Sequence, residues 1–312
     1  MKPEIILVEP MMASVEAALD AAYTVHRLAA APDRGALLAE VGPRVRAVVT
    51  GGATGVSNAV MDACPNLGVV TINGVGTDAV DLNYAAGRGI RVTNTPGVLT
   101  EDVADLALGL IIAVSRRLIV GDRFVRAGQW PQAKMPLARK VTGKRLGIFG
   151  LGRIGRAIAE RAAGFGMSIA YTNRSVCADV PYRCLDSLEE LARESDILVV
   201  AASAGPENRN IVGRAVLDAL GPDGILVNVA RGSIVDEAEL VAALVEGRLG
   251  AAGLDVFADE PNVPQALWSL DNVVLQPHVA SATVETRTAM ADLVLANLGA
   301  FFAGQPLPTP VV

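Results

Sequence analysis

Polar side chains that could act together on a carbonyl group follow short apolar runs in the second half of the sequence. His278 comes after Asn272–Leu275, and histidine is the side chain that most often transfers a proton near neutral pH. Arg231 follows Ile225–Val227 and precedes Gly232, so we expect its forked guanidinium to face a cleft, where it suits a carboxylate or a carbonyl oxygen. These residue types predict acid catalysis of a carbonyl reduction.

A carboxylate that could hold the imidazole lies between these two positions. Glu260 is fixed ahead of Pro261 and could pair with His278, orient its ring and stabilise its protonated form. Asp259 is the alternative residue for this role. His26, the other histidine of the chain, lies in a β-like run away from the glycine loops, and we expect it to be structural.

A glycine motif near the middle of the chain predicts a dinucleotide site. Three glycines follow an apolar run with the spacing G-x-G-x-x-G, and a helical stretch comes after them. Gly150 permits the tight turn, Gly152 lets the backbone approach the phosphates, and Gly155 allows close packing of the helix. The pyrophosphate would lie on free N–H groups at the start of this helix. The expected contacts therefore include the intervening residues, Arg153 and Ile154.

The tip of the next strand indicates which dinucleotide binds. An NAD site usually has Asp or Glu about 20 residues after the motif, for the ribose hydroxyls. Here the strand Met167–Thr172 ends in Asn173, Arg174 and Ser175, which can donate hydrogen bonds to a 2′-phosphate and lack the charge that would repel it. This favours NADP(H). The alternative is that Arg174 is a solvated turn residue and that NAD binds without an acidic partner.

Short β-like runs alternate with helical ones on both sides of the motif, which predicts parallel sheets covered by helices. The length of 312 residues suits about two domains, and Asn94–Gly97 marks a candidate boundary. The helix expected over Thr100–Arg117 is apolar on more than one face, so it should be buried between domains or between subunits. Phe124–Leu137 is expected to be an irregular arm, and Val284–Phe302 a last helix that returns to the first domain.

The composition argues against several partners. The net charge of −6 argues against nucleic acid or an anionic membrane. The longest apolar stretch, Val103–Val114, falls short of the ~20 residues of a membrane span. The three cysteines have no metal-ligand spacing, so we expect no metal site and free thiols in a reducing compartment, the cytoplasm.

Taken together and in order, the motifs of the chain resemble those of the D-2-hydroxyacid dehydrogenase family. They are Gly150–Gly155, Val229–Gly232 with Val235-Asp236, Asp255–Phe257 with Glu260-Pro261, and Pro277–Ala280. Within the family, Tyr171–Ser175 and the segment from Arg116-Arg117 to Trp130 are most similar to NADP-dependent glyoxylate/hydroxypyruvate reductases. The resemblance implies two doubly wound parallel-sheet domains with the active site in the cleft between them. A flavodoxin-like substrate domain would comprise residues 1–98 and 284–312, and a Rossmann cofactor domain residues 99–283.

The same resemblance assigns roles to residues. Arg231 would bind a small 2-oxo acid, His278 would protonate its carbonyl oxygen, and Glu260 would hold His278. Backbone N–H groups of Val75 and Gly76 would bind the substrate carboxylate, which agrees with a glycine-rich loop able to accept an anion. Further cofactor contacts would be Ala230 and Asp255. Members of this branch form dimers through the segment around the long helix, so a homodimer is expected.

The sequence leaves alternatives open and departs from the family in places. An NAD-linked relative of the D-lactate or phosphoglycerate dehydrogenase type is the first alternative to an NADPH-dependent glyoxylate and hydroxypyruvate reductase. A dinucleotide-sensing protein without catalysis is the second, because fold does not decide function. Residues 131–137 contain no aromatic side chain, although some members place one in the active site of the partner. Asn73, at the start of the Val75 loop, has no role that its type or position explains.

Overall fold

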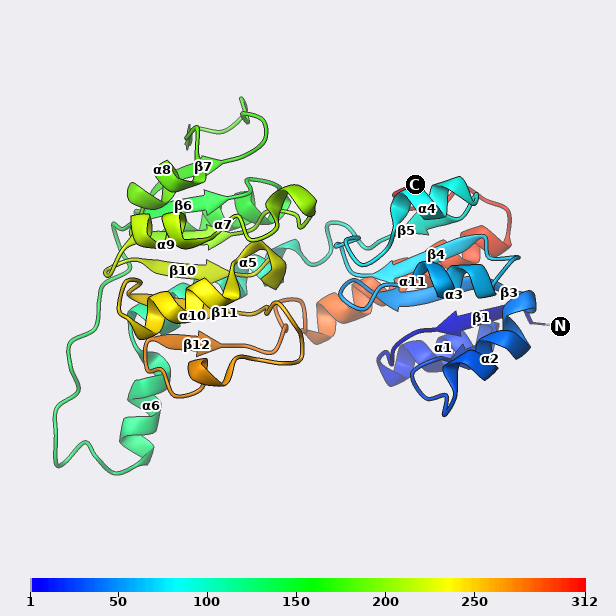
Figure 1. The fold of residues 1–312 in the computed structure, drawn as a ribbon, viewed down its shortest axis with the longest axis horizontal. Coiled ribbons are helices and arrows are strands. Elements are labelled where there is room, and N and C mark those ends of the chain that lie inside the picture. The colour runs from blue at the N-terminus through cyan, green and yellow to red at the C-terminus, as the bar shows by residue number, and fades with distance from the viewer. Residues whose placement is uncertain (1) are drawn as a thin grey trace. The chain divides into compact units, whose positions relative to one another are not determined.

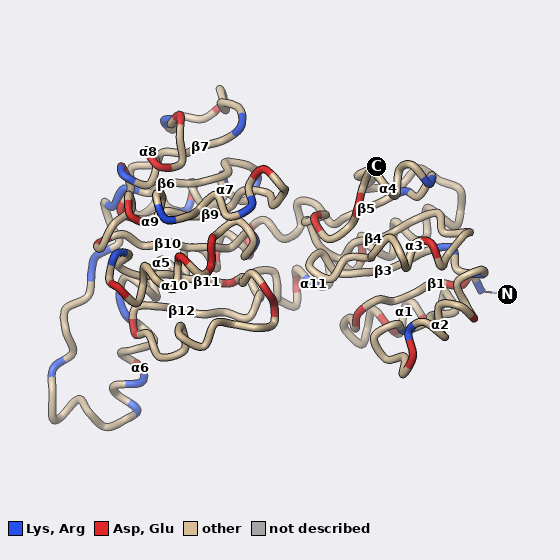
Figure 2. The backbone as a smooth tube through the Cα atoms, viewed as in Figure 1, with Lys and Arg blue, Asp and Glu red and all other residues tan. Residues whose placement is uncertain are grey.

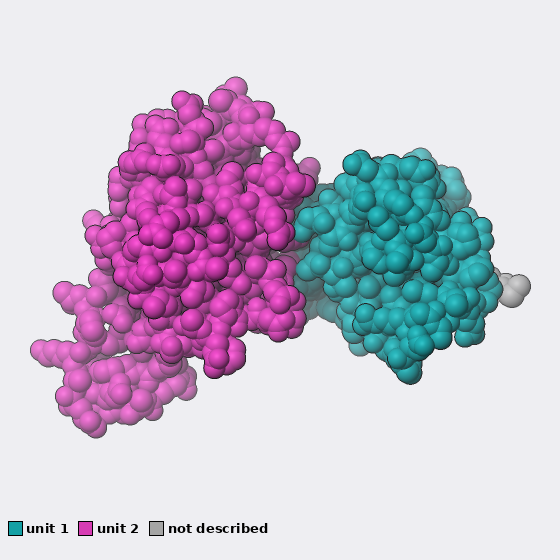
Figure 3. Space-filling model, in the orientation of Figure 1, with its two compact units in different colours: residues 1–99, 282–312 teal, residues 100–281 magenta. Residues whose placement is uncertain are grey.

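The computed structural model describes residues 2–312, which form two compact units (Figure 3). Of these, unit 1 comprises residues 2–99 and 282–312, and unit 2 comprises residues 100–281. Each unit is built on one all-parallel sheet (Figure 1). Among the described residues, no helix combines the length and the apolar composition needed to cross a bilayer.

Unit 1 has a five-stranded sheet in the order β2-β1-β3-β4-β5. This is the flavodoxin-like order, in which the direction of winding reverses between the first and third strands. The strands are β1 (Glu4–Leu7), β2 (Thr24–Arg27), β3 (Val45–Gly51), β4 (Val69–Asn73) and β5 (Arg91–Thr93). The helices are α1 (Ala13–Ala22), α2 (Arg34–Val41), α3 (Asn58–Ala63), α4 (Leu82–Gly87) and α11 (Val284–Phe302).

Helices cover both faces of this sheet, and successive strand residues point to opposite faces, so both sets of side chains are buried. Ile5 and Leu7 pack in one cluster with residues of α1 and α11, whereas Ile6 packs in the other with residues of α2, α3 and α4. Helix α11 therefore belongs to the core of unit 1, as its length suggested. Helix α2 was not predicted; Asp33 caps it by accepting a hydrogen bond from the Ala36 amide at 3.0 Å.

Unit 2 has a seven-stranded sheet in the order β12-β11-β10-β9-β6-β7-β8. Read from β8, this is the doubly wound Rossmann order extended by one strand. The strands are β6 (Arg145–Phe149), β7 (Ser168–Thr172), β8 (Arg183–Cys184), β9 (Ile197–Val200), β10 (Ile225–Asn228), β11 (Ala251–Leu254) and β12 (Val273–Leu275). The helices are α5 (Thr100–Ser115), α6 (Leu118–Arg126), α7 (Arg153–Ala163), α8 (Leu188–Arg193), α9 (Arg214–Leu220) and α10 (Glu237–Val245).

The segment after the boundary agrees with expectation in part. The long helix, α5, is buried as expected, and within unit 2 it packs on α7, β10 and β11. A side chain at Gly253 of β11 would press against Leu110, so the glycine allows this close approach. The expected arm over Phe124–Leu137 is helical in its first three residues, because α6 extends to Arg126, and residues 127–137 are irregular as expected. The apolar residues of α6 are not buried, unlike those of α5, so apolarity on several faces, which predicted α5, does not predict α6.

Candidate active site

The loop that carries His278 is held by a buried carboxylate. Asp255, at the end of β11, accepts hydrogen bonds from the amides of Val279 at 2.8 Å and Ala280 at 2.9 Å. Its backbone oxygen accepts from the His278 amide at 2.8 Å. Burial raises the pKa of Asp255, although the two N–H groups favour the charged form. The predicted cofactor contact of Asp255 remains a prediction; its observed role is to hold the His278 loop.

The backbone of His278 adopts a conformation that is uncommon for a residue with a side chain. Its φ angle is +53°, in the left-handed region. Such conformations cost free energy and persist where the surrounding contacts hold them, often at functional sites. The three hydrogen bonds to Asp255 provide that restraint.

Glu260 makes contact with the imidazole through one oxygen and with the backbone through the other. Oε2 lies 2.6 Å from Nδ1 of His278, and Oε1 accepts a hydrogen bond from the Phe257 amide at 3.0 Å. Burial acts to raise the pKa of Glu260, but the hydrogen bonds from His278 and Phe257 outweigh it and hold the pKa below its usual value. An ionised carboxylate can only accept, so Nδ1 of His278 must carry a proton, and Nε2 remains for a ligand.

The neighbouring Asp259 does not contact the imidazole but makes a local hydrogen bond. Its Oδ2 accepts a hydrogen bond from the side chain of Asn262 at 3.1 Å, which closes a local turn. Of the two acidic residues that the sequence left open, the structure pairs Glu260 with His278.

Arg231 follows β10, and two nearby residues, Asn228 and Gly232, position its loop beside the segment that carries Glu260. The buried side chain of Asn228 accepts from the Ala230 amide at 3.1 Å and donates to the Arg231 carbonyl at 3.0 Å, which shapes the loop. A side chain at Gly232 would overlap the backbone of Phe257, so the glycine lets this loop contact the segment that leads to Glu260. The positive charge of Arg231 contributes to the low pKa of Glu260. The structure thus gathers the three predicted residues.

The glycine motif forms the predicted strand, turn and helix. Gly150 has a φ of +99°, and a side chain there would overlap the backbone of Ala202. A side chain at Gly155 would overlap the carbonyl oxygen of Gly150, so the helix packs closely on the strand. Apart from its chain neighbours and the backbone of its own helix, no atom of residues 2–312 lies within 4 Å of a Cβ built on Gly152, the N-cap of α7. The open space lies where a phosphate would approach the helix N-terminus, so these residues fit a dinucleotide.

At the tip of β7, where cofactor contacts were expected, Asn173 and Arg174 have hydrogen-bond partners within the protein. Asn173 accepts a hydrogen bond from the Leu151 amide at 2.8 Å, so its side chain holds the glycine turn, a role that its type alone did not indicate. Arg174 is 84 % exposed and donates to Glu207, in the loop after β9, at 2.8 Å. Ser175 is exposed. Asp179 forms an ion pair with Arg156 at 2.8 Å.

The predicted substrate loop belongs to unit 1. The side chain of Asn94 donates to the Val75 carbonyl at 2.8 Å, and the Thr95 amide donates to the Gly74 carbonyl at 2.9 Å. Among residues 2–312, two buried side-chain oxygens have no hydrogen-bond partner, Oδ1 of Asn73 and Oγ1 of Thr95. Both lie beside this loop. Unsatisfied buried polar atoms are uncommon and point to a functional place.

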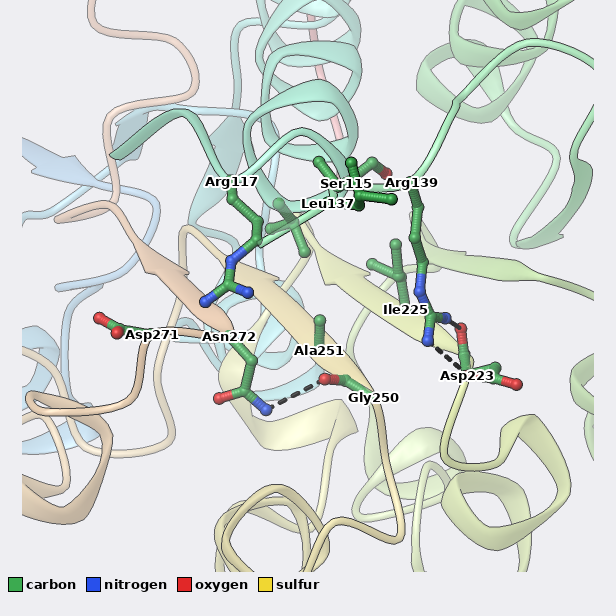
Figure 4. A pocket seen from close by; sticks show the side chains of 13 residues that line it. Ser115, Arg117, Leu137, Arg139, Asp223, Ile225, Gly250, Ala251, Asp271 and Asn272 are labelled. Atoms are coloured by element: carbon green, nitrogen blue, oxygen red, sulfur yellow. Dashed lines mark hydrogen bonds and ion pairs between the residues drawn. The ribbon is translucent and has the colours of Figure 1, made fainter. Parts of the chain in front are cut away.

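A cavity of about 420 Å³ lies elsewhere in unit 2 (Figure 4). Its lining includes Ile225, Ala251 and Asn272, at the amino ends of β10, β11 and β12. Arg139 closes one side by donating to the Asp223 carbonyl at 2.6 Å. Arg231, Glu260 and His278 follow the carboxyl ends of these strands, so this cavity is at the opposite edge of the sheet.

The Rossmann sheet, the glycine turn and the gathered Arg231, Glu260 and His278 define a dinucleotide-dependent oxidoreductase. Residues 108–280 match the family described as D-isomer specific 2-hydroxyacid dehydrogenase, NAD binding domain. The chain belongs to the D-2-hydroxyacid dehydrogenase family, which confirms the resemblance of its motifs.

Relatives along the whole chain differ in the substrates that their names give. The chain is 47% identical to 2-ketogluconate reductase from Gluconobacter oxydans, over 100% of this chain and 99% of that protein. It is 51% identical to hydroxyphenylpyruvate reductase from Plectranthus scutellarioides, over 99% and 98%. A solved NADPH-dependent glyoxylate/hydroxypyruvate reductase from Sinorhizobium meliloti, in complex with NADP and malonate, is 42% identical with a TM-score of 0.93, over 100% and 97%.

Proposed function

We propose that this chain reduces small 2-oxo acids such as glyoxylate and hydroxypyruvate to D-2-hydroxy acids with NADPH. The observation that carries the proposal is the 2.6 Å contact between Glu260 and His278 beside Arg231. A protein that only senses a dinucleotide has no need for this arrangement. Residues 1–98 and 284–312 would form the substrate-binding domain, and residues 99–283 the dinucleotide-binding domain.

The roles of the catalytic residues follow from their chemistry. Arg231 binds the 2-oxo acid through its fork of N–H donors. His278, protonated at both ring nitrogens, donates the Nε2 proton to the carbonyl oxygen. Glu260 keeps Nδ1 protonated and stabilises the imidazolium by its charge. The backbone N–H groups of Val75 and Gly76 hold the substrate carboxylate.

The glycine turn and the tip of β7 would hold the cofactor, whose reduced nicotinamide supplies the hydride when bound. The pyrophosphate would lie on the N-terminus of α7, against Gly152, Arg153 and Ile154. The 2′-phosphate would be bound by Arg174 and Ser175, since Asn173 already holds the turn. The NADP complex of the Sinorhizobium meliloti relative supports this choice of cofactor. Ala230 and Asp255 complete the proposed contacts.

The proposal includes a homodimer in the cytoplasm. Apolar residues on and beside α6 are largely exposed, with Leu118 at 51%, Val125 at 54% and Trp130 at 71%. A second copy of the chain would cover them, and light scattering tests this directly. The cysteines Cys64, Cys177 and Cys184 are free thiols, which suits a reducing compartment.

The decisive experiment follows the absorbance at 340 nm with NADPH or NADH and glyoxylate, hydroxypyruvate or pyruvate. We expect oxidation of NADPH with the first two substrates. His278→Asn should abolish turnover and retain NADPH binding. Preference for NADH would favour the NAD-linked alternative, and absence of turnover with every pair would favour the sensing protein.

A further inference from the structure

A carboxylate of unit 1 stands where the topology of the sheet predicts a ligand. Glu9 follows β1 by two residues, and Gly51 ends β3. The order β2-β1-β3-β4-β5 reverses its winding between β1 and β3. In open parallel sheets, ligands bind outside the carboxyl ends of the strands at this switch point. Glu9 is therefore at the edge of the sheet where a bound substrate is expected.

The contacts of Glu9 leave most of its hydrogen-bonding capacity unused. Oε2 accepts from the hydroxyl of Thr54, and a side chain at Gly51 would overlap the carboxylate, so the glycine makes room for it. Several other acidic residues of unit 1 have arginine partners, such as Glu4 with Arg44 and Asp62 with Arg88. Within residues 2–312, the recorded partner of Glu9 is a neutral hydroxyl. An ionised carboxylate offers about four acceptor positions.

The loop proposed to bind the substrate carboxylate is close to this position. Gly51 of β3 pairs in register with Asn73 of β4, and a Cβ on Gly74 would be 3.1 Å from the Gly52 backbone. The loops after β3 and β4 thus touch each other. The carboxylate of Glu9 reaches Gly51 of β3, and β3 lies one strand spacing, ~4.8 Å, from β4. A substrate whose carboxylate is held at Val75 and Gly76, beyond the end of β4, therefore reaches Glu9 with the part of its carbon chain that is farthest from that carboxylate.

We propose that Glu9 selects 2-oxo acids whose carbon chain carries hydroxyl groups beyond C3, the class of the 2-oxo aldonic acids. This inference rests on the proposed function and extends its substrate range. Hydroxyl groups donate hydrogen bonds to a carboxylate, and such charge-assisted bonds are about twice as strong as neutral ones. An aromatic ring without a hydroxyl group, as in phenylpyruvate, would remove water from the carboxylate without replacing its hydrogen bonds. The similar identities to the 2-ketogluconate and hydroxyphenylpyruvate reductases do not distinguish these classes.

The test measures kcat/KM with NADPH for glyoxylate, 2-oxogluconate and phenylpyruvate, whose ring carries no hydroxyl group. For the wild type we expect the kcat/KM for 2-oxogluconate to exceed that for phenylpyruvate. Glu9→Gln should lower the ratio of kcat/KM for 2-oxogluconate to that for glyoxylate about tenfold, the loss expected for one hydrogen bond to a charged group. Thr54→Val is the matched control, because it removes the contact of Glu9 within the loop and keeps the carboxylate; its ratio should stay within about twofold.

If the wild type reduces glyoxylate, any of three results would overturn the role of Glu9 and leave the proposed function intact. They are a wild-type preference for phenylpyruvate, an unchanged ratio in Glu9→Gln, or an equal fall in Thr54→Val, which would make Glu9 a support of the loop. Absence of turnover with all three acids would overturn the proposed function as well. Thermal unfolding of each variant separates misfolding from altered selectivity, and Glu9→Ala supplies a second variant if Glu9→Gln unfolds.

Discussion

Replacement of Glu260 by Gln tests the acid–base pair most directly. The carboxylate accepts two hydrogen bonds, from Nδ1 of His278 at 2.6 Å and from the Phe257 amide at 3.0 Å. An amide has one oxygen, so it can accept only one of them and must turn its NH₂ group towards the other donor. In either orientation the imidazolium loses a charged partner.

The size of the effect follows from the lost interaction. The side chains of Glu260 and His278 are 26% and 32% exposed, so solvent screens the pair only in part. A hydrogen bond to a charged group contributes about 1.5–3 kcal/mol, which corresponds to a fall in kcat/KM of about 10- to 150-fold.

The assay is steady-state oxidation of NADPH with glyoxylate, alongside NADPH binding measured by fluorescence. Binding should change by less than about threefold, because Glu260 is not among the proposed cofactor contacts. Asp259→Asn is the control, since Asp259 contacts Asn262 and not the imidazole. A Glu260→Gln enzyme whose kcat/KM is within twofold of the wild type would refute the role assigned to Glu260.

Three further predictions concern the cofactor site and the response to acid. Arg174→Ala should raise the KM for NADPH on the order of tenfold and leave that for NADH unchanged in steady-state assays; equal changes for both cofactors would contradict a contact with the 2′-phosphate. Gly155→Ala should destabilise the fold by about 1–3 kcal/mol in urea unfolding, because the methyl group would overlap the Gly150 carbonyl. The lowered pKa of Glu260 stabilises the fold above the usual value of 4.5, and this contribution is lost as the pH falls through the lower folded-state value. The difference in unfolding free energy between wild type and Glu260→Gln should therefore shrink below about pH 4.5, and a difference that grows would contradict this sign.

Several features of the site could be inferred from residue types and spacing because each depends on local chemistry. The glycines at 150, 152 and 155 have steric roles that hold wherever a strand turns into a phosphate-binding helix. A histidine and an arginine after apolar strands meet at one edge because parallel strands end together. The alternation of strands and helices was enough for both sheets, whose orders follow common winding rules.

Other features depend on contacts between distant segments, which spacing does not specify. Asp259 and Glu260 are adjacent, and only the path of the loop decides which of them reaches the imidazole. The side chain of Asn173, at the end of β7, accepts a hydrogen bond from Leu151 in the turn after β6. These two residues are 22 positions apart in the chain and come together because β6 and β7 are neighbours in the sheet. Helix α5 is apolar on several faces because its own unit covers them, whereas the apolar residues of α6 stay exposed, a difference that sequence patterns could not supply.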